Sequence, residues 1–270
     1  LLQKDKDYDY LLGACGALQI MLNLYELTYD EQFLDDAIVA ANKLIENAKY
    51  EDEDTIFWVS TQATNALAGL SHGQSGFSLM FARLGMIAKN QYYINISRKA
   101  MNYEDQFYNT KIENWSDQRI INGVRNEEKG VNPVAWCHGA SGILLSRIYM
   151  YDCIEDKEFK QLICADIDNA VKSCIKFGYR NNYCLCHGDF GNVEILREYA
   201  MKFKDKETEE LCNNLIVSMT KEVMVKEWHC GLPNEYENPG FMTGISGIGY
   251  SLLRRYCPQL PNILALDIGY

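Results

Sequence analysis

Three short stretches of the chain place a histidine directly before a glycine, and in two of them a cysteine comes directly before that histidine. They are Ser71-His72-Gly73, Trp136-Cys137-His138-Gly139 and Leu185-Cys186-His187-Gly188. Thiolate and neutral imidazole are common zinc ligands in proteins, and imidazole also transfers protons near neutral pH. The sequence therefore predicts a metal centre with acid/base groups, provided that the fold brings these turns together.

Cys186 and His187 are consecutive, and adjacent residues on a regular helix point about 100° apart. Both side chains can therefore reach one ion only from a turn, which Gly188 makes possible. With Cys137 they form a Cys₂His set that leaves a fourth position open, the pattern of a catalytic zinc site. A structural zinc site would more often show a fourth protein ligand and a short CxxC knuckle.

Other cysteines and histidines offer alternatives to this set. Cys184 lies two residues before Cys186 and could replace it, and His229-Cys230-Gly231 imitates the Cys-His-Gly turn. Neither is followed by a glycine-led apolar helix, so both rank below the chosen set. His138 is interpreted as a residue that supports a ligand or faces solvent. The remaining cysteines stand in apolar helical contexts typical of core residues: Cys15, Cys153, Cys164, Cys174, Cys212 and Cys257.

The elements that must position these turns follow a repeating pattern. Five pairs of glycines three residues apart each begin an apolar segment, and their second members stand at 16, 76, 142, 191 and 247. Amphipathic helices are predicted between them, over 30–48, 91–110, 156–177 and 205–227, with Asp30 as a cap and Gly178 as a stop. Apolar helices paired with amphipathic ones predict two concentric layers, an all-α fold of the α/α toroid type, with an open α-solenoid as the alternative.

Composition narrows the class of protein further. The 270 residues carry a net charge of −11, and 47% of them are hydrophobic, which predicts a packed fold and argues against a nucleic-acid partner. No apolar run is long enough for a transmembrane helix, and the opening LLQKDKDYDY does not resemble a signal peptide. Ten cysteines without such a signal indicate reduced thiols and a cytoplasmic location.

Four motifs together resemble the lanthionine synthetase C-like family: HGQSG at 72–76, WCHG at 136–139, CHG at 186–188 and PGFMTG at 239–244. The likeness runs from residue 9 to residue 265 and is greatest to the C-terminal cyclase domain of the bifunctional class II lanthipeptide synthetases. It implies an α/α toroid of seven inner and seven outer helices. Since five repeats are visible, residues 1–270 are expected to be a C-terminal cyclase fragment without the first hairpins and the upstream dehydratase domain.

The resemblance also implies site residues and an activity. One zinc ion would be held by Cys137, Cys186 and His187, and His72 and Asp9 would transfer protons. The expected enzyme is a zinc-dependent lanthionine cyclase, which adds peptide cysteine thiols to dehydroalanine or dehydrobutyrine in a dehydrated precursor peptide. In this hypothesis zinc lowers the pKa of the substrate thiol, and His72, assisted by Asp9, protonates the resulting enolate.

Three other functions compete with this interpretation. The domain could add a small thiol such as glutathione to dehydrated residues, or it could be an inert zinc-bearing toroid that only binds peptides. An α/α-toroid glycosidase would require paired carboxylates across the mouth. Asp189 and Glu194 lie within one segment, and a glycosidase would leave the Cys/His set unexplained.

Overall fold

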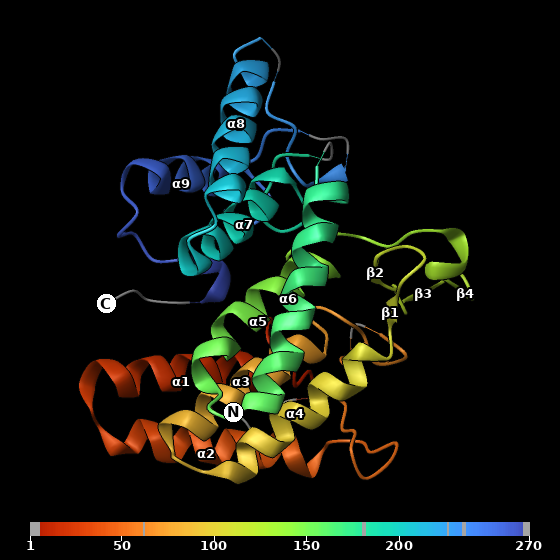
Figure 1. Ribbon diagram of the computed structural model, residues 1–270, viewed down its shortest axis with the longest axis vertical. Helices are drawn as coiled ribbons and strands as arrows, with labels where there is room; N and C mark the ends of the chain where they lie inside the picture. The colour runs from red at the N-terminus through yellow and green to blue at the C-terminus, as the bar shows by residue number, and fades with distance from the viewer. Residues whose placement is uncertain (1–5, 62, 180–181, 226, 234–235, 267–270) are drawn as a thin grey trace.

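The computed structural model describes residues 6–61, 63–179, 182–225, 227–233 and 236–266, and most of their regular structure is helical (Figure 1). The helices are α1 (Ala14–Thr28), α2 (Glu31–Glu46), α3 (Gln74–Ile87), α4 (Gln91–Asp105), α5 (Ala140–Cys153), α6 (Lys157–Phe177), α7 (Asp189–Phe203), α8 (Lys206–Val223) and α9 (Ile245–Tyr256), with the short 3₁₀ turns η2 (Glu127–Lys129) and η4 (Ile263–Ala265).

The glycine pairs mark the starts of the inner helices as predicted. In each pair the first glycine is the N-cap, and the helix begins at the residue after it. These N-cap glycines are Gly13, Gly73, Gly139, Gly188 and Gly244. The second glycine packs against the turn before the helix. A Cβ atom at Gly142 would lie 2.2 Å from the Trp136 carbonyl oxygen, and one at Gly191 would lie 1.9 Å from that of Leu185. No side chain fits there, so each turn can fold back tightly over its helix.

The four predicted outer helices are also present, as α2, α4, α6 and α8. The Asp30 carboxylate accepts a hydrogen bond from the Gln32 N–H at 3.0 Å and caps α2, and Gly178 ends α6. Helices α4 and α8 end before the predicted positions 110 and 227. The amphipathic pattern therefore located these helices well but overran the C-terminal ends of α4 and α8, and by two residues that of α2.

The helices form two layers. Each outer helix packs on the inner helix that precedes it, and the inner helices α1, α3, α5, α7 and α9 contact one another in that order. Figure 1 shows the succession from α1–α4 at the bottom, through α5 and α6, to α7–α9 at the top. Because inner helices are covered on several sides, α3 and α5 are buried along most of their length. Within the described ranges no helix has the length and apolar character needed to cross a bilayer.

Two small hairpins that the sequence did not predict lie between α4 and α5, at the right of Figure 1. Strands β1 (Tyr108–Asn109) and β2 (Asn114–Trp115) pair antiparallel, as do β3 (Ile120–Ile121) and β4 (Val124–Arg125). Strands of two residues are too short to show an alternating pattern in the sequence. The segment leads from the outer layer back to the turn that carries Cys137.

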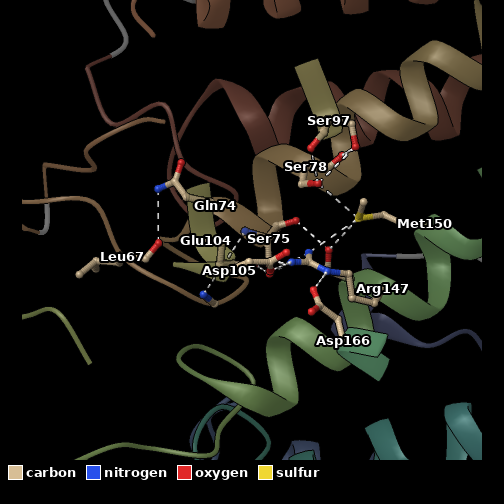
Figure 2. Close-up of polar contacts among 12 residues, drawn as sticks. Leu67, Gln74, Ser75, Ser78, Ser97, Glu104, Asp105, Arg147, Met150 and Asp166 are labelled. Atoms are coloured by element: carbon tan, nitrogen blue, oxygen red, sulfur yellow. Dashed lines mark hydrogen bonds and ion pairs between the residues drawn. The ribbon is translucent and has the colours of Figure 1, made fainter. Parts of the chain in front are cut away.

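A buried ion cluster joins four helices of the two layers (Figure 2). Arg147 of α5 is fully buried. It bonds Glu104 of α4 at 2.8 Å and Asp166 of α6 at 2.7 Å, and Asp105 lies 3.6 Å away. Glu104 also accepts hydrogen bonds from the backbone N–H groups of Gly69, in the turn before α3, and of Ser75, in the first turn of α3. The cluster therefore fixes the turn before α3 against the neighbouring hairpin.

Candidate metal centre

Cys137, Cys186 and His187 come from the turns that precede the neighbouring inner helices α5 and α7. Their candidate ligand atoms all lie within 4.8 Å of one another, and all three residues are half-buried. Two atoms bound to one zinc ion at about 2.0–2.3 Å can be at most about 4.6 Å apart, so the observed spacing is close to that of a shared ion. Among the described residues no other group of three or more His, Cys, Asp or Glu side chains has this spacing.

The Cys137 turn depends on a glycine for its backbone. Gly139 has a φ of +80°, and a Cβ atom there would lie 2.0 Å from the Pro133 carbonyl oxygen. The backbone N–H of Cys137 donates to the Cys186 carbonyl oxygen at 3.3 Å, which ties this turn to the next. Cys137 lies just before the N-terminus of α5, and Cys186 just before that of α7. The helix dipole favours thiolate at such positions.

The two thiols interact directly. A hydrogen bond from Cys186, aided by the nearby His138 and His187 and opposed by burial, holds the pKa of the Cys137 thiol well below its usual value. The same hydrogen bond, together with burial, raises the pKa of Cys186. Of the two thiols, Cys137 is therefore the one that loses its proton more readily.

His187 is oriented by a backbone carbonyl. Its Nε2 lies 3.0 Å from the Gly231 carbonyl oxygen. Since a carbonyl only accepts, this contact assigns the proton to Nε2 and makes Nδ1 the nitrogen with a lone pair for a metal. The His229-Cys230-Gly231 turn, considered as an alternative ligand source, thus supplies the acceptor that orients a ligand.

Cys184 has a different partner. Its sulfur accepts a hydrogen bond from the backbone N–H of His187 at 3.4 Å. It is buried and does not belong to the three-residue ligand group. The structure therefore separates Cys184 from Cys186, a choice that the sequence left open.

Asp9 and His72 form a hydrogen-bonded pair beside this centre. The buried Asp9 carboxylate lies 2.8 Å from His72 Nδ1 and accepts from Ser60 Oγ at 2.5 Å and from the backbone N–H groups of Leu11 and Leu12. The carboxylate is therefore fixed, and it fixes the imidazole. Because Nδ1 donates to Asp9, Nε2 is the ring nitrogen left for exchange with a substrate.

The His72 turn contacts the backbone of the Cys137 turn. Ser71 Oγ donates to the Cys137 carbonyl oxygen at 3.1 Å. Gly69 has a φ of +116°, and a Cβ atom there would lie 3.1 Å from the same oxygen. The His72 ring lies 6.1 Å from that of His138, which is buried and does not face solvent. The structure thus places all five predicted site residues around one region.

Sequence reasoning missed the roles of Ser60 and Gly231 in this region and left the environment of His138 open. Ser60 contacts Asp9 from a loop 51 residues away, Gly231 acts through its backbone, and His138 is buried between the two groups. A lone serine in a loop carries no motif. The His229-Cys230-Gly231 turn was noticed only as a source of side-chain ligands, and a role for the Gly231 carbonyl carried no signal in the sequence. The position of His138 beside Cys137 was a signal, but its burial depends on the fold.

The fold and this site together define a two-layered helical toroid with a candidate Cys₂His centre beside an Asp–His pair. A model of the lanthionine synthetase C-like protein family matches residues 1–268, and the chain belongs to that family.

Comparisons with two individual proteins agree with this family assignment. The lacticin 481/lactococcin biosynthesis protein LcnDR2 of Lactococcus lactis subsp. lactis is 31% identical over 232 residues, and the match covers 81% of this chain and 24% of that protein. The chain thus matches about a quarter of the length of this relative. The structure of a nisin cyclase superposes with a TM-score of 0.71 at 21% identity, covering 98% of this chain and 68% of the other. This likeness confirms the α/α toroid.

Proposed function

We propose that the chain is a zinc-dependent lanthionine cyclase that closes thioether rings in a dehydrated lanthipeptide precursor. The observation that carries this proposal is the convergence of Cys137, Cys186 and His187 next to the Asp9–His72 pair. Two thiolates and one imidazole suit zinc and leave a fourth position for a substrate sulfur. When bound there, zinc supplies a Lewis acid that keeps the substrate thiol deprotonated near neutral pH.

The remaining chemistry is a proton transfer that this chain's own residues can perform. Ring closure forms one C–S bond between the substrate sulfur and the β-carbon of dehydroalanine or dehydrobutyrine. The π electrons of the broken double bond move toward the α-carbon and its carbonyl, and the thiol proton passes to solvent. His72 then donates a proton from Nε2 to the α-carbon and regains one from solvent, while Asp9 holds Nδ1 and orients the ring. The peptide mass is unchanged.

The partners and location follow from the same proposal. The substrate is a dehydrated precursor peptide, supplied by a dehydratase domain upstream in the same polypeptide, with residues 1–270 as the cyclase domain. The length of the lactococcal relative supports this arrangement. All ten cysteines, each within the described ranges, are without disulfides, which supports the cytoplasm as the compartment. The net charge of −11 gives no support for a nucleic-acid partner.

The test uses a peptide with one cysteine and one dehydroalanine, incubated with the zinc-loaded chain. Ring closure leaves its mass unchanged but blocks thiol alkylation, and mass spectrometry detects both. We expect one zinc per chain and full protection in the wild type. Cys186→Ala should lose zinc and activity together, because only two ligands remain. The matched control Cys164→Ala, on α6 and outside the ligand group, should keep both.

Other outcomes of the same assay would support the competing functions or refute the assigned ligands. A peptide mass increased by one added glutathione would identify a thiol-adding enzyme. Normal zinc binding by a wild type that closes no ring would favour an inert peptide-binding toroid. One zinc per chain retained in a Cys137→Ala/Cys186→Ala double variant would refute the assigned ligands.

A further inference from the structure

The chain returns to the centre of the molecule after α9. Residues 262–266, here called the inner segment, include η4, and its residues Leu264 and Ala265 are almost completely buried in the same core as the inner helices. Asn262 caps the turn by accepting from the Leu264 N–H at 3.1 Å. The inner segment is thus a packed part of the toroid interior.

Three successive carbonyl groups of the inner segment each accept a side-chain hydrogen bond. The Leu264 carbonyl accepts from Trp136 Nε1 at 2.8 Å, that of Ala265 from the Tyr10 hydroxyl at 2.8 Å, and that of Leu266 from Asn23 Nδ2 at 2.7 Å. The last carbonyls of a short helical turn have no partner within the turn, so side chains must satisfy them when they are buried.

Two of these donors adjoin the site described above. Tyr10 directly follows Asp9, and Trp136 directly precedes Cys137. Tyr10 also packs on the start of α3, since a Cβ atom at Gly76 would lie 2.8 Å from the Tyr10 Cβ. Tyr10 is therefore attached to the Asp9–His72 pair and Trp136 to the metal centre, and both side chains bond the backbone of the inner segment.

We propose that the inner segment is a positioning element for ring closure. Through Tyr10 and Trp136 it fixes the distance between the Asp9–His72 pair and the Cys137 side of the metal centre. The inference rests on the proposed function, in which the sulfur attacks one carbon and the proton goes to its immediate neighbour. Reacting groups aimed at adjacent atoms tolerate little error, and a displacement of about 1 Å can cost about 100-fold in rate.

The experiment removes one donor at a time and keeps an aromatic ring at each position. Tyr10→Phe should lower kcat about tenfold with KM and zinc affinity unchanged, because Asp9 and His72 shift relative to the sulfur. Trp136→Phe should weaken zinc binding about tenfold, because Cys137 loses its support, and should lower kcat as well. Zinc affinity is measured by competition with a chelating dye without peptide, and kcat and KM with the single-ring peptide, well below the unfolding temperature.

Tyr250→Phe is the matched control. The Tyr250 hydroxyl donates to the Pro261 carbonyl oxygen at 3.0 Å, a bond of the same kind just before the inner segment, but Tyr250 lies on α9 and adjoins no site residue. It should match the wild type within twofold in kcat and zinc affinity.

The proposal is overturned if Tyr10→Phe and Trp136→Phe also stay within twofold of the wild type in both measurements. Tyr10→Phe removes a single oxygen and decides the matter if Trp136→Phe does not fold. If the wild type closes no ring but Trp136→Phe still weakens zinc binding, the proposed reaction fails while the link to the metal centre stands.

Discussion

Two clusters of charged or metal-binding side chains join different hairpins of this toroid, and they differ in how completely their groups are satisfied. Around Arg147 a fully buried guanidinium faces Glu104, Asp105 and Asp166, and hydrogen bonds or ion pairs link them (Figure 2). At the metal centre the ligand atoms of three half-buried residues lie close together, and two of them are thiol sulfurs whose interaction lowers the pKa of Cys137. The first arrangement is closed, whereas the second has capacity for a further partner.

The difference teaches how to separate structural from functional polar groups in this fold. A buried charge is tolerated when neighbours compensate for its lost hydration, and removing one member then destabilises the protein. Potential ligands held close together with coordination capacity left over raise the electrostatic cost of folding and are retained when they bind something. We therefore expect changes at Arg147 to alter stability and changes around the metal centre to alter reaction rate.

The largest expected effect is on ring closure in His72→Asn. Loss of a positioned general acid typically costs about 10²- to 10⁴-fold in rate, and Asn keeps a polar group of similar size next to Asp9. We expect kcat to fall within this range while zinc stoichiometry and the unfolding midpoint stay near wild type. Stopped assays with thiol capping measure the rate. His229→Asn, a histidine outside the ligand group and the Asp9–His72 pair, is the control, and an equal loss in it would contradict the assigned role.

The second prediction concerns the stability of the Arg147→Met variant. Leaving three acidic groups without their buried cation should lower the free energy of unfolding by about 3–5 kcal/mol, measured by urea denaturation. Zinc bound per folded molecule should not change, because Arg147 does not contact the ligands. Arg98→Met is the control. Arg98 pairs with the exposed Glu158 at 2.7 Å, so its loss should cost about 1 kcal/mol or less. Zinc loss from folded Arg147→Met would break the distinction between the two clusters.

A third effect concerns the dependence of stability on pH. Burial and the neighbouring Asp166 raise the pKa of Asp105 to about 8, whereas an unfolded aspartate titrates near about 3.9. Between these values the folded protein holds a proton that the unfolded chain has lost, so this group's contribution to stability falls as pH rises from about 4 to about 8. Asp105→Asn should flatten the dependence of unfolding free energy on pH over this range.

Urea denaturation at successive pH values measures this slope. Asp35→Asn, on the exposed side of α2, serves as the control and should keep the wild-type slope. An unchanged slope in Asp105→Asn would show that the proton belongs to another group of the cluster.

The sequence predicted the fold closely because its two kinds of helix carry different local signals. Glycine pairs located the starts of all five inner helices, and amphipathic periodicity located the outer ones. The hairpins over 108–125 were missed because strands of two residues have no periodicity to detect. Arg147 was also missed, since it stands in an apolar run, ILLSRIYM, and its carboxylate partners lie on other helices.

For the site, residue types and turn context by themselves determined which side chains to consider: Asp9, His72, Cys137, Cys186 and His187. Only the tertiary structure decided that Cys186 and not Cys184 lies in the ligand group, that Gly231 orients His187, and that the inner segment bonds both Tyr10 and Trp136. The reason is physical. Helix signals and turn chemistry act over a few neighbouring residues, whereas hydrogen-bond partners across the toroid are set by how complete hairpins pack.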